Sequence, residues 1–378
     1  MPPTNPTPFT RLKYLHVSGV NGYVTTGISL LFGPALSGFV LRSGHDVILS
    51  SLLVSAAERS SGLKTLIVRE IPSYVSSVLR HFKELEFLSC VDTRLPANGL
   101  AALALIPTLQ DLSIRLPDAW TTPESAMTFL ALRSLNIYRV TNFTSLYHLL
   151  RSVKSNKLRT LNISIGHNPQ DYSFAQRAVE ALSGLSSLRS LMVSTLGDAI
   201  RPVTFGLGLL ANLRHLQHLS LCGLYLNSPS FLRLIREWPD LESLTLRGSK
   251  IIDNAGRLYL VPGYLRILAI HLPKLKELTI AINTSGGLPP SNQRIYSPNR
   301  IRIDLSESPL DEDKLEAFAK YIAEVFPNGY LREDFPPLTI GYPYCDEYVR
   351  LQERWKTVAR LVPDISRASK ERMAHTPF

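Results

Sequence analysis

Cysteine is scarce in this 378-residue sequence, and its scarcity excludes two kinds of protein. Cys90, Cys222 and Cys345 lie far apart along the chain. An odd number of isolated cysteines cannot form a complete disulfide framework, and none has the closely spaced Cys or His partners of a zinc site. The first ten residues also lack the basic and apolar segments of a secretory signal. We therefore expect reduced thiols and a cytoplasmic or nuclear location.

Long apolar runs are missing as well. Residues 17–41 carry no charge, but a membrane-spanning helix needs about 20 mostly apolar residues. In this stretch the apolar residues are interrupted by residues that disfavour a helix, namely Gly19, Gly22, Gly27, Gly33, Pro34 and Gly38. We therefore expect neither a membrane span nor a membrane partner.

The signatures of catalysis are also absent from the sequence. It contains no G-x-S-x-G elbow, no phosphate-binding loop and no H-E-x-x-H motif. The nearest approach to a metal-binding pattern is the pair His215 and His218, and no third ligand recurs near it. Cys222 has no adjacent base that would activate its thiol. We predict that the protein is not an enzyme and that it holds no metal and no cofactor.

Apolar residues, in contrast, are abundant. They make up 45% of the chain, and charged residues make up 19%, as in a folded protein with a large buried core. Disordered chains are poor in Leu, Ile, Val and aromatic residues, and this chain is rich in them, so we expect it to be folded. The formal net charge of +10 favours acidic proteins or polyanions as partners. A basic surface that serves only solubility explains the charge equally well.

A six-residue pattern, L-x-x-L-x-Φ with Φ apolar, recurs along the chain. Its copies begin at residues 12, 36, 63, 85, 109, 132, 158, 188, 216, 241, 275 and 300; the copy at 36 has Phe39 in place of the second Leu, and the last has Arg300 and Ile303 in place of both. The mean interval of about 26 residues is typical of leucine-rich repeats, which run to about 20–29 residues. Two more matches, LAALAL at 100 and LRILAI at 265, directly precede better copies. We assign both of them to helices.

Each copy is expected to form a short strand. We number the repeat from its first Leu, so that positions 1, 4 and 6 point into the core. Apolar stripes in residues 73–82, 144–153 and 228–238 predict helices between the strands, and strands separated in this way pair in parallel. Because no unit buries its apolar face alone, stacking supplies the core. The predicted fold is an α/β leucine-rich-repeat solenoid with parallel strands on the concave face and helices on the convex face.

The two ends are expected to differ from the middle. Residues 1–11 are predicted to be a disordered segment, and residues 12–310 to be the solenoid of about 12 repeats. Residues 311–363 are predicted to form a helical C-terminal cap that closes the open end of the core, with helices at 311–326 and 346–361. Residues 364–378 are predicted to be a polar, frayed tail.

Several longer patterns extend the similarity beyond the repeat itself. They are LFGPALSGFVL at 31–41, LPANGLAALALIPTLQDLSIRLPD at 95–118, REWPDLESLTL at 236–246, HLPKLKELTIAIN at 271–283 and DLSESPLDEDKLEAFAKYIAEVFPN at 304–328. With these patterns the chain resembles the F-box leucine-rich-repeat proteins of basidiomycete fungi, over residues 12 to about 360. The resemblance implies a solenoid that recognises a target protein. It also implies an F-box module that docks on the Skp adaptor of a cullin ubiquitin ligase.

The sequence departs from that family at two places. Only eleven residues precede Leu12, and a three-helix F-box needs several times that length. We therefore do not expect this chain by itself to bind the Skp adaptor or a cullin. Position 9 holds Asn or Cys in many leucine-rich repeats, but here it holds residues such as Pro117 and Gly166, and only Asn283 conforms. We expect an irregular solenoid.

The concave face suggests where a partner binds. Small polar residues fill positions 3 and 5 of the middle repeats, and basic residues flank them at positions 2 and 7. Over these four positions we count eleven basic and five acidic residues. A groove with basic edges fits an acidic peptide or protein surface. The predicted partner-binding residues are Arg115, Arg133, Asn136, Tyr138, Arg139, Arg159, Asn162, Arg189, His218 and Arg247.

Two other interpretations of this face remain open. Ser, Thr and Asn also suit a strand that faces solvent, with Lys and Arg serving solubility. Phosphate binding needs only clustered Lys and Arg, although the face lacks the aromatic platforms of single-stranded nucleic-acid binders. We predict a non-catalytic protein–protein recognition scaffold, resembling the target-binding part of an F-box ubiquitin-ligase substrate receptor. The alternative is a ligase-independent scaffold or a solenoid that binds polyanions or nucleic acid.

Overall fold

The computed structural model describes most of the chain, in two compact units of residues 1–187 and 188–378. The described residues are 9–18, 25–42, 46–120, 127–170, 172–195, 204–205, 207–247, 250–252, 260–285, 287–290, 297–332 and 346–374. Of the segment predicted to be disordered, residues 1–8 lie outside this set and residues 9–11 form a turn. Cys345 and the proline-rich residues 335–344 also lie outside it.

The first unit is built on seven strands that pair in sequence order, each parallel to the next. Every strand contains one copy of the repeat, and the copies align position by position, as Leu112, Leu135 and Leu161 do at position 4. The strands are β1 (Tyr14–Val17), β2 (Gly38–Leu41), β3 (Thr65–Val68), β4 (Phe87–Arg94), β5 (Asp111–Arg115), β6 (Ser134–Asn142) and β7 (Thr160–Gln170).

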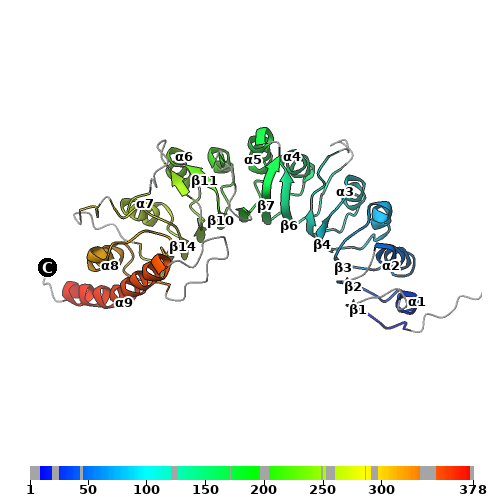
Figure 1. The fold of residues 1–378 in the computed structure, drawn as a ribbon, viewed down its shortest axis with the longest axis horizontal. Coiled ribbons are helices and arrows are strands. Elements are labelled where there is room, and N and C mark those ends of the chain that lie inside the picture. Colours follow the sequence, from blue (N-terminus) through cyan, green and yellow to red (C-terminus); the bar gives the residue numbers. More distant parts are fainter. Residues whose placement is uncertain are drawn as a thin grey trace, which may run out of the picture. The chain divides into compact units, whose positions relative to one another are not determined.

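Helices follow the strands and line one side of the sheet in this unit (Figure 1). The match LAALAL lies in helix α3, as predicted. The predicted helix at 73–82 forms as a 3₁₀ helix rather than an α-helix, with Val75 and Leu79 buried. The helices are α1 (Thr25–Ser29), α2 (Asp46–Arg59), η1 (Ser73–His81), α3 (Ala97–Ala104), α4 (Phe143–Ser152), η3 (Tyr172–Phe174) and α5 (Ala175–Ser183).

The second unit repeats this plan with six parallel strands, again in sequence order. They are β8 (Ser190–Thr195), β10 (His218–Cys222), β12 (Ser243–Thr245), β14 (Glu277–Thr279), β15 (Arg302–Asp304) and β16 (Tyr330–Leu331). A second small parallel sheet, which the repeat pattern does not predict, joins β13 (Lys250–Ile252), β11 (Tyr225–Asn227) and β9 (Thr204–Phe205).

The helices of the second unit confirm the assignment of LRILAI, which lies in α7. The predicted helix at 228–238 is also present, as α6, but it ends at Ile235; Phe231 within it and Trp238 after it are fully buried. The helices are η4 (Leu207–Asn212), α6 (Ser228–Ile235), α7 (Gly263–His271), η5 (Glu312–Lys314), α8 (Leu315–Val325) and α9 (Asp346–Ala374).

The C-terminal end differs from the sequence prediction in two ways. The sheet continues beyond residue 310, because Tyr330 and Leu331 pair with β15 and Leu331 is buried at position 4. Helix α8 therefore belongs to a further repeat rather than to a cap. The segment predicted as a frayed tail is helical up to Ala374, and Ser366 within it is buried.

Packing explains why α9 stays attached to the second unit. Trp355 is fully buried, and its ring meets that of Phe318 edge to face at a centroid distance of 5.4 Å. The indole Nε1 donates a hydrogen bond to the carbonyl oxygen of Ser308 at 2.9 Å. A buried aromatic side chain with a satisfied polar atom is a strong anchor.

Within each unit the core follows the repeat. Positions 4 and 6 are buried from β2 onward, for example Leu135 and Ile137 in β6. The edge strand β1 is the exception, because its Leu15 and Val17 are only half-buried. Parallel strands with buried positions 4 and 6 and helices between them make the fold an α/β leucine-rich-repeat solenoid. None of the helices that the structure describes is both long and apolar enough to cross a membrane.

Candidate binding site on the strand face

The strand face of the first unit carries a ladder of polar side chains at position 5. Ser113, Asn136 and Asn162 lie side by side on β5, β6 and β7. Asn162 Nδ2 donates to Asn136 Oδ1 at 2.6 Å, and Asn136 Nδ2 donates to Ser113 Oγ at 3.0 Å. Each amide carries two N–H groups and one carbonyl oxygen, so the ladder uses only part of their capacity. The result is a pre-ordered polar row on which a partner can form further hydrogen bonds.

Two exposed arginines, Arg133 and Arg159, flank this ladder at position 2. Backbone pairing fixes their spacing, since the Arg133 carbonyl oxygen accepts from the Arg159 amide at 2.8 Å. Arg159 Nη1 also donates to the carbonyl oxygen of Ser187 at 3.0 Å. Neither guanidinium forms an ion pair within the described residues. At the same position Lys64 is neutralised by Glu86, 2.9 Å away.

One carboxylate does lie close to this pair. Burial raises the pKa of Asp111, at position 3 of β5, and the guanidinium of Arg133 acts in the opposite direction. A single partly buried carboxylate beside two exposed guanidiniums leaves this edge of the face positive.

The opposite edge carries an arginine cluster, which consists of Arg94, Arg115 and Arg139. Burial lowers the pKa of Arg115, the charges of Arg94 and Arg139 lower it further, and the carboxylate of Asp92 acts in the opposite direction. Arg94 forms an ion pair with Asp118. Arg115 Nη1 donates to the backbone carbonyl oxygen of Asp92 at 2.8 Å, a neutral group. Asp92, a second carboxylate near Arg115, forms an ion pair with Arg69 at 3.3 Å, so the cluster holds more positive charge than its nearby carboxylates balance.

A β-bulge places Arg139 in this cluster. Ile137 pairs with Ile163 and Val140 pairs with Ile165, so Tyr138 and Arg139 lie opposite the single residue Ser164. Such a bulge bends the strand and redirects side chains. Arg139 has φ of 51°, the left-handed region that non-glycine residues rarely adopt. Both bulge residues are exposed, Tyr138 to 41%.

Three predicted site residues lie in the second unit. Arg189 and His218 are exposed and lie next to each other, because Ser190 of β8 pairs with His218 of β10. Arg247 is half-buried and forms an ion pair with Glu307 at 3.6 Å, so its charge is balanced within the protein. The structure therefore favours Arg189 and His218 over Arg247 as contact residues.

Arg94 and Asp118 are members of the site that sequence reasoning missed. The repeat pattern covers only six residues, whereas β4 runs for eight, to Arg94. A register shift between Cys90 and Arg94 then brings Arg94 opposite Arg115. Arg94 follows the copy at 85–90 by only four residues, and this basic residue was the available signal. The register shift that brings it opposite Arg115 has no sequence signature of its own.

The groups considered for chemistry lie in unremarkable surroundings. Burial raises the pKa of the Cys90 thiol to about 12 and also raises that of Cys222, which leaves both thiols protonated and unreactive near neutral pH. His218 lies on strand β10 and His215 in the turn before it. The described residues contain no group of three or more His, Cys, Asp or Glu side chains that could hold a metal ion.

Comparison with known proteins gives no family. No protein-family model matches the sequence, and no curated protein matches it. An internalin (inlF) of Listeria monocytogenes has 14% identity, with 89% of this chain and 88% of that chain covered, at a TM-score of 0.43. A leucine-rich-repeat protein of Leptospira interrogans has 16% identity, with 86% and 78% covered, at a TM-score of 0.39. A TDR receptor has 16% identity, with 85% and 52% covered, at a TM-score of 0.43.

Proposed function

We propose that this protein is a non-catalytic recognition scaffold whose first unit binds an acidic segment of a partner protein. The observation that carries the proposal is the arrangement of charge on β5, β6 and β7. Arg133 and Arg159 lie on one edge of the polar ladder, and Arg115 and Arg139 lie on the other. Positive groups on both sides of a pre-ordered polar row complement an acidic chain lying along it.

The residue types suit this role. The planar guanidinium of arginine forms two parallel hydrogen bonds with a carboxylate and stacks on aromatic rings. A lysine ammonium does neither. Neighbouring parallel strands lie about 4.8 Å apart, so Arg133 and Arg159 can contact neighbouring residues of an extended peptide. On the opposite edge, beside Arg115 and Arg139, the exposed ring of Tyr138 offers an apolar contact.

Binding to a protein is favoured over binding to nucleic acid by what lies between the two basic edges. The central row there is Ser113, Asn136 and Asn162, whereas single-stranded nucleic acids are bound on rows of aromatic side chains. Polyanion binding is the alternative, and heparin tests it. If heparin displaces the protein partner to the same extent whether or not Arg133 and Arg159 are present, a general charge effect would be favoured.

We further propose that the bound target is a substrate of a ubiquitin ligase, as the resemblance to F-box leucine-rich-repeat proteins implies. The support is the set of sequence patterns spread over residues 12 to about 360. Purification of the protein from its native cells with mass spectrometry tests this part. Recovery of the Skp adaptor and a cullin together with a target would support it, and recovery of a target alone would select a ligase-independent scaffold.

The same purification tests the binding face when three forms of the protein are compared. In the groove variant, Arg133→Glu and Arg159→Glu reverse two charges beside the ladder. In the control variant, Lys356→Glu and Arg360→Glu reverse two charges on α9. Proteins retained by the wild type and the control variant but lost by the groove variant are the expected partners. Equal recovery by all three forms would overturn the proposed face.

A further inference from the structure

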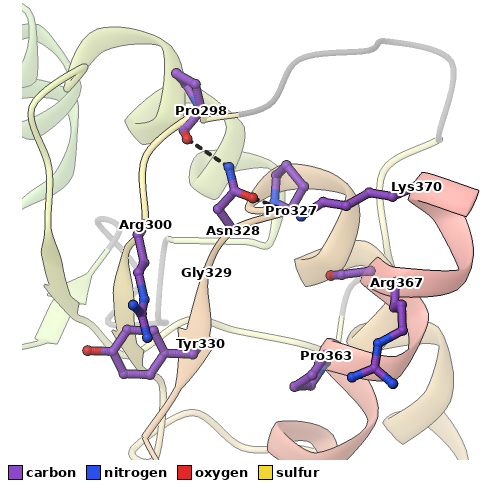
Figure 2. A pocket seen from close by; sticks show the side chains of 10 residues that line it. Pro298, Arg300, Pro327, Asn328, Gly329, Tyr330, Pro363, Arg367 and Lys370 are labelled. Atoms are coloured by element: carbon purple, nitrogen blue, oxygen red, sulfur yellow. Dashed lines mark hydrogen bonds between the residues drawn. The ribbon is translucent and has the colours of Figure 1, made fainter. Parts of the chain in front are cut away.

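A pocket with positively charged walls lies in the second unit, between the last strands and helix α9. Its volume is about 590 Å³. Three segments line it: residues 298–300 before β15, residues 327–330 around the start of β16, and residues 363–370 of α9 (Figure 2). None of the predicted binding residues of the strand face belongs to it.

The charge of this pocket is not balanced by its own lining. Arg300, Arg367 and Lys370 line it, and no described carboxylate does. Elsewhere in the same unit basic side chains have acidic partners, as Lys274 has Asp240 at 2.6 Å. A concave site lined by one sign of charge concentrates its counter-ion.

Neutral groups hold two of the three cations in place. Lys370 Nζ donates to Asn328 Oδ1 at 2.9 Å, and Asn328 Nδ2 donates to the carbonyl oxygen of Pro298 at 2.8 Å (Figure 2). The guanidinium of Arg300 lies over the ring of Tyr330, 5.4 Å from its centroid. These contacts position the cations without neutralising them, which is the arrangement that an incoming anion requires.

A buried hydroxyl in the lining supplies an independent observation. Ser366 is 8% exposed, and its Oγ is buried without a hydrogen-bond partner in the described part of the chain. Buried polar atoms are almost always hydrogen-bonded, and one left unsatisfied is unfavourable. Because Ser366 lines the pocket, a ligand oxygen there would accept its hydrogen.

We infer that this pocket binds a phosphate monoester. Guanidinium, ammonium, hydroxyl and amide N–H groups together form a donor set for phosphate oxygens. The volume falls within the range of small-molecule sites, roughly 300–1,000 Å³, so there is room for an organic group behind the phosphate. Tyr330 and the proline rings offer that group an apolar wall. The phosphate belongs either to a small molecule or to a phosphorylated side chain of a protein.

The test is calorimetric titration of the whole protein with two probes, phenyl phosphate and a phosphoserine peptide. Saturable binding of phenyl phosphate would support a small-molecule source, and saturable binding of the peptide alone would support a phosphorylated protein. Absence of saturable binding by both probes would overturn the inference.

Three variants make the test specific. Arg367→Glu with Lys370→Glu is expected to weaken binding at least about tenfold, since it reverses two donors. Lys356→Glu with Arg360→Glu changes the net charge equally on the same helix outside the pocket, and is expected to bind as the wild type does. Ser366→Ala is expected to weaken binding about threefold or more without lowering the unfolding temperature, because it removes an unsatisfied hydroxyl. Equal losses in both charge-reversal variants would contradict a site in this pocket.

This inference is independent of the proposed function. The groove variant, with Arg133→Glu and Arg159→Glu, is expected to bind both probes normally. A protein that loses its partner but keeps phosphate binding would separate the two sites. Loss of probe binding in the groove variant would contradict the assignment to the second unit.

Discussion

Leu135 shows what position 4 of the repeat contributes to stability. It is fully buried in β6, between Leu112 and Leu161 of the neighbouring strands. Leu135→Ala is expected to lower the free energy of unfolding by about 2–5 kcal/mol, through lost apolar burial and the cavity that remains. Denaturant titration measures the change. A loss well under 1 kcal/mol would show that this residue does not belong to a packed core.

Arg139 tests whether the bulge is strained. Arg139→Ala and Arg139→Gly remove the same charge, but alanine at φ near 51° keeps the strain of the left-handed region and glycine does not. The glycine variant is expected to be more stable than the alanine variant by about 1 kcal/mol. An alanine variant as stable as the glycine variant would place Arg139 in an ordinary conformation. Both variants are expected to bind the partner more weakly than the wild type.

Cys90 gives a pH dependence whose sign follows from its burial. The pKa of this thiol is raised from 9.0 to about 12 in the folded protein. The folded state therefore keeps a proton that the unfolded state releases above pH 9, and stability is lost as pH rises from about 9 towards 12. Between pH 8 and 10.5 the wild type is expected to lose about 2 kcal/mol more stability than Cys90→Ala. Parallel curves for the two proteins would contradict a buried, protonated thiol.

At the scale of single elements, helix α4 depends on its cap. The Asn142 side chain accepts a hydrogen bond from the Ser145 amide at 3.1 Å, which satisfies one of the unpaired N–H groups at the helix start. Asn142→Ala is expected to cost about 1 kcal/mol, and Asn142→Ser, which keeps a capping oxygen, is expected to cost less. Thermal unfolding of the three proteins compares them. An alanine variant as stable as the wild type would show that the cap contributes nothing.

The elements themselves could be predicted well where the repeat governs them. Leucines at positions 1 and 4 and an apolar residue at position 6 identify ten strands, and two more follow from copies with Phe39 or Ile303 at position 4, because this spacing buries one face of every strand against its neighbours. Two matches that share this spacing, at 100 and 265, are helices. The distance to the next copy identified them, since nine or ten residues leave no room for a connection between parallel strands.

Other elements could not be predicted, and each for a physical reason. The unit that contains β16 has Asn328 at position 1 instead of Leu, so only Leu331 at position 4 marks it. The small sheet of β9, β11 and β13 has two or three residues per strand, too few for a periodic signal. Helix α9 passes through Pro363, a residue that normally predicts a helix end.

The candidate site also has a part that could be predicted from the sequence and a part that could not. The register of the repeat predicts which residues share a row, so the pairs Arg133–Arg159 and Asn136–Asn162 could be placed side by side from the sequence. It does not predict conformations beyond position 7, where the bulge at Tyr138 and Arg139 and the extended end of β4 build the arginine cluster. Charge balance depends on which acid reaches which base, and this is why Arg247 was predicted as a contact although it pairs with Glu307.

At the scale of the whole molecule, two positively charged sites are proposed to bind different ligands. The strand face of the first unit carries exposed arginines and is proposed to bind an acidic protein segment. The pocket in the second unit is concave and is proposed to hold a phosphate group. Most of the remaining basic side chains on the strands are balanced by acids of neighbouring repeats, as Lys276 is by Glu242 at 2.6 Å. The net charge of +10 alone would not have separated these two sites from the rest of the surface.

The central claim is that Arg133 and Arg159 contact an acidic partner, and the dissociation constant of the purified partner tests it most directly. It is measured for the wild type, for the groove variant and for the control variant Lys356→Glu with Arg360→Glu, at one salt concentration. The groove variant is expected to raise the dissociation constant at least about tenfold, or about 1.4 kcal/mol, with its unfolding temperature unchanged, because exposed substitutions barely affect stability. The control variant is expected to change it by less than about twofold. An unchanged constant in the groove variant, or an equal rise in both variants, would contradict the claim.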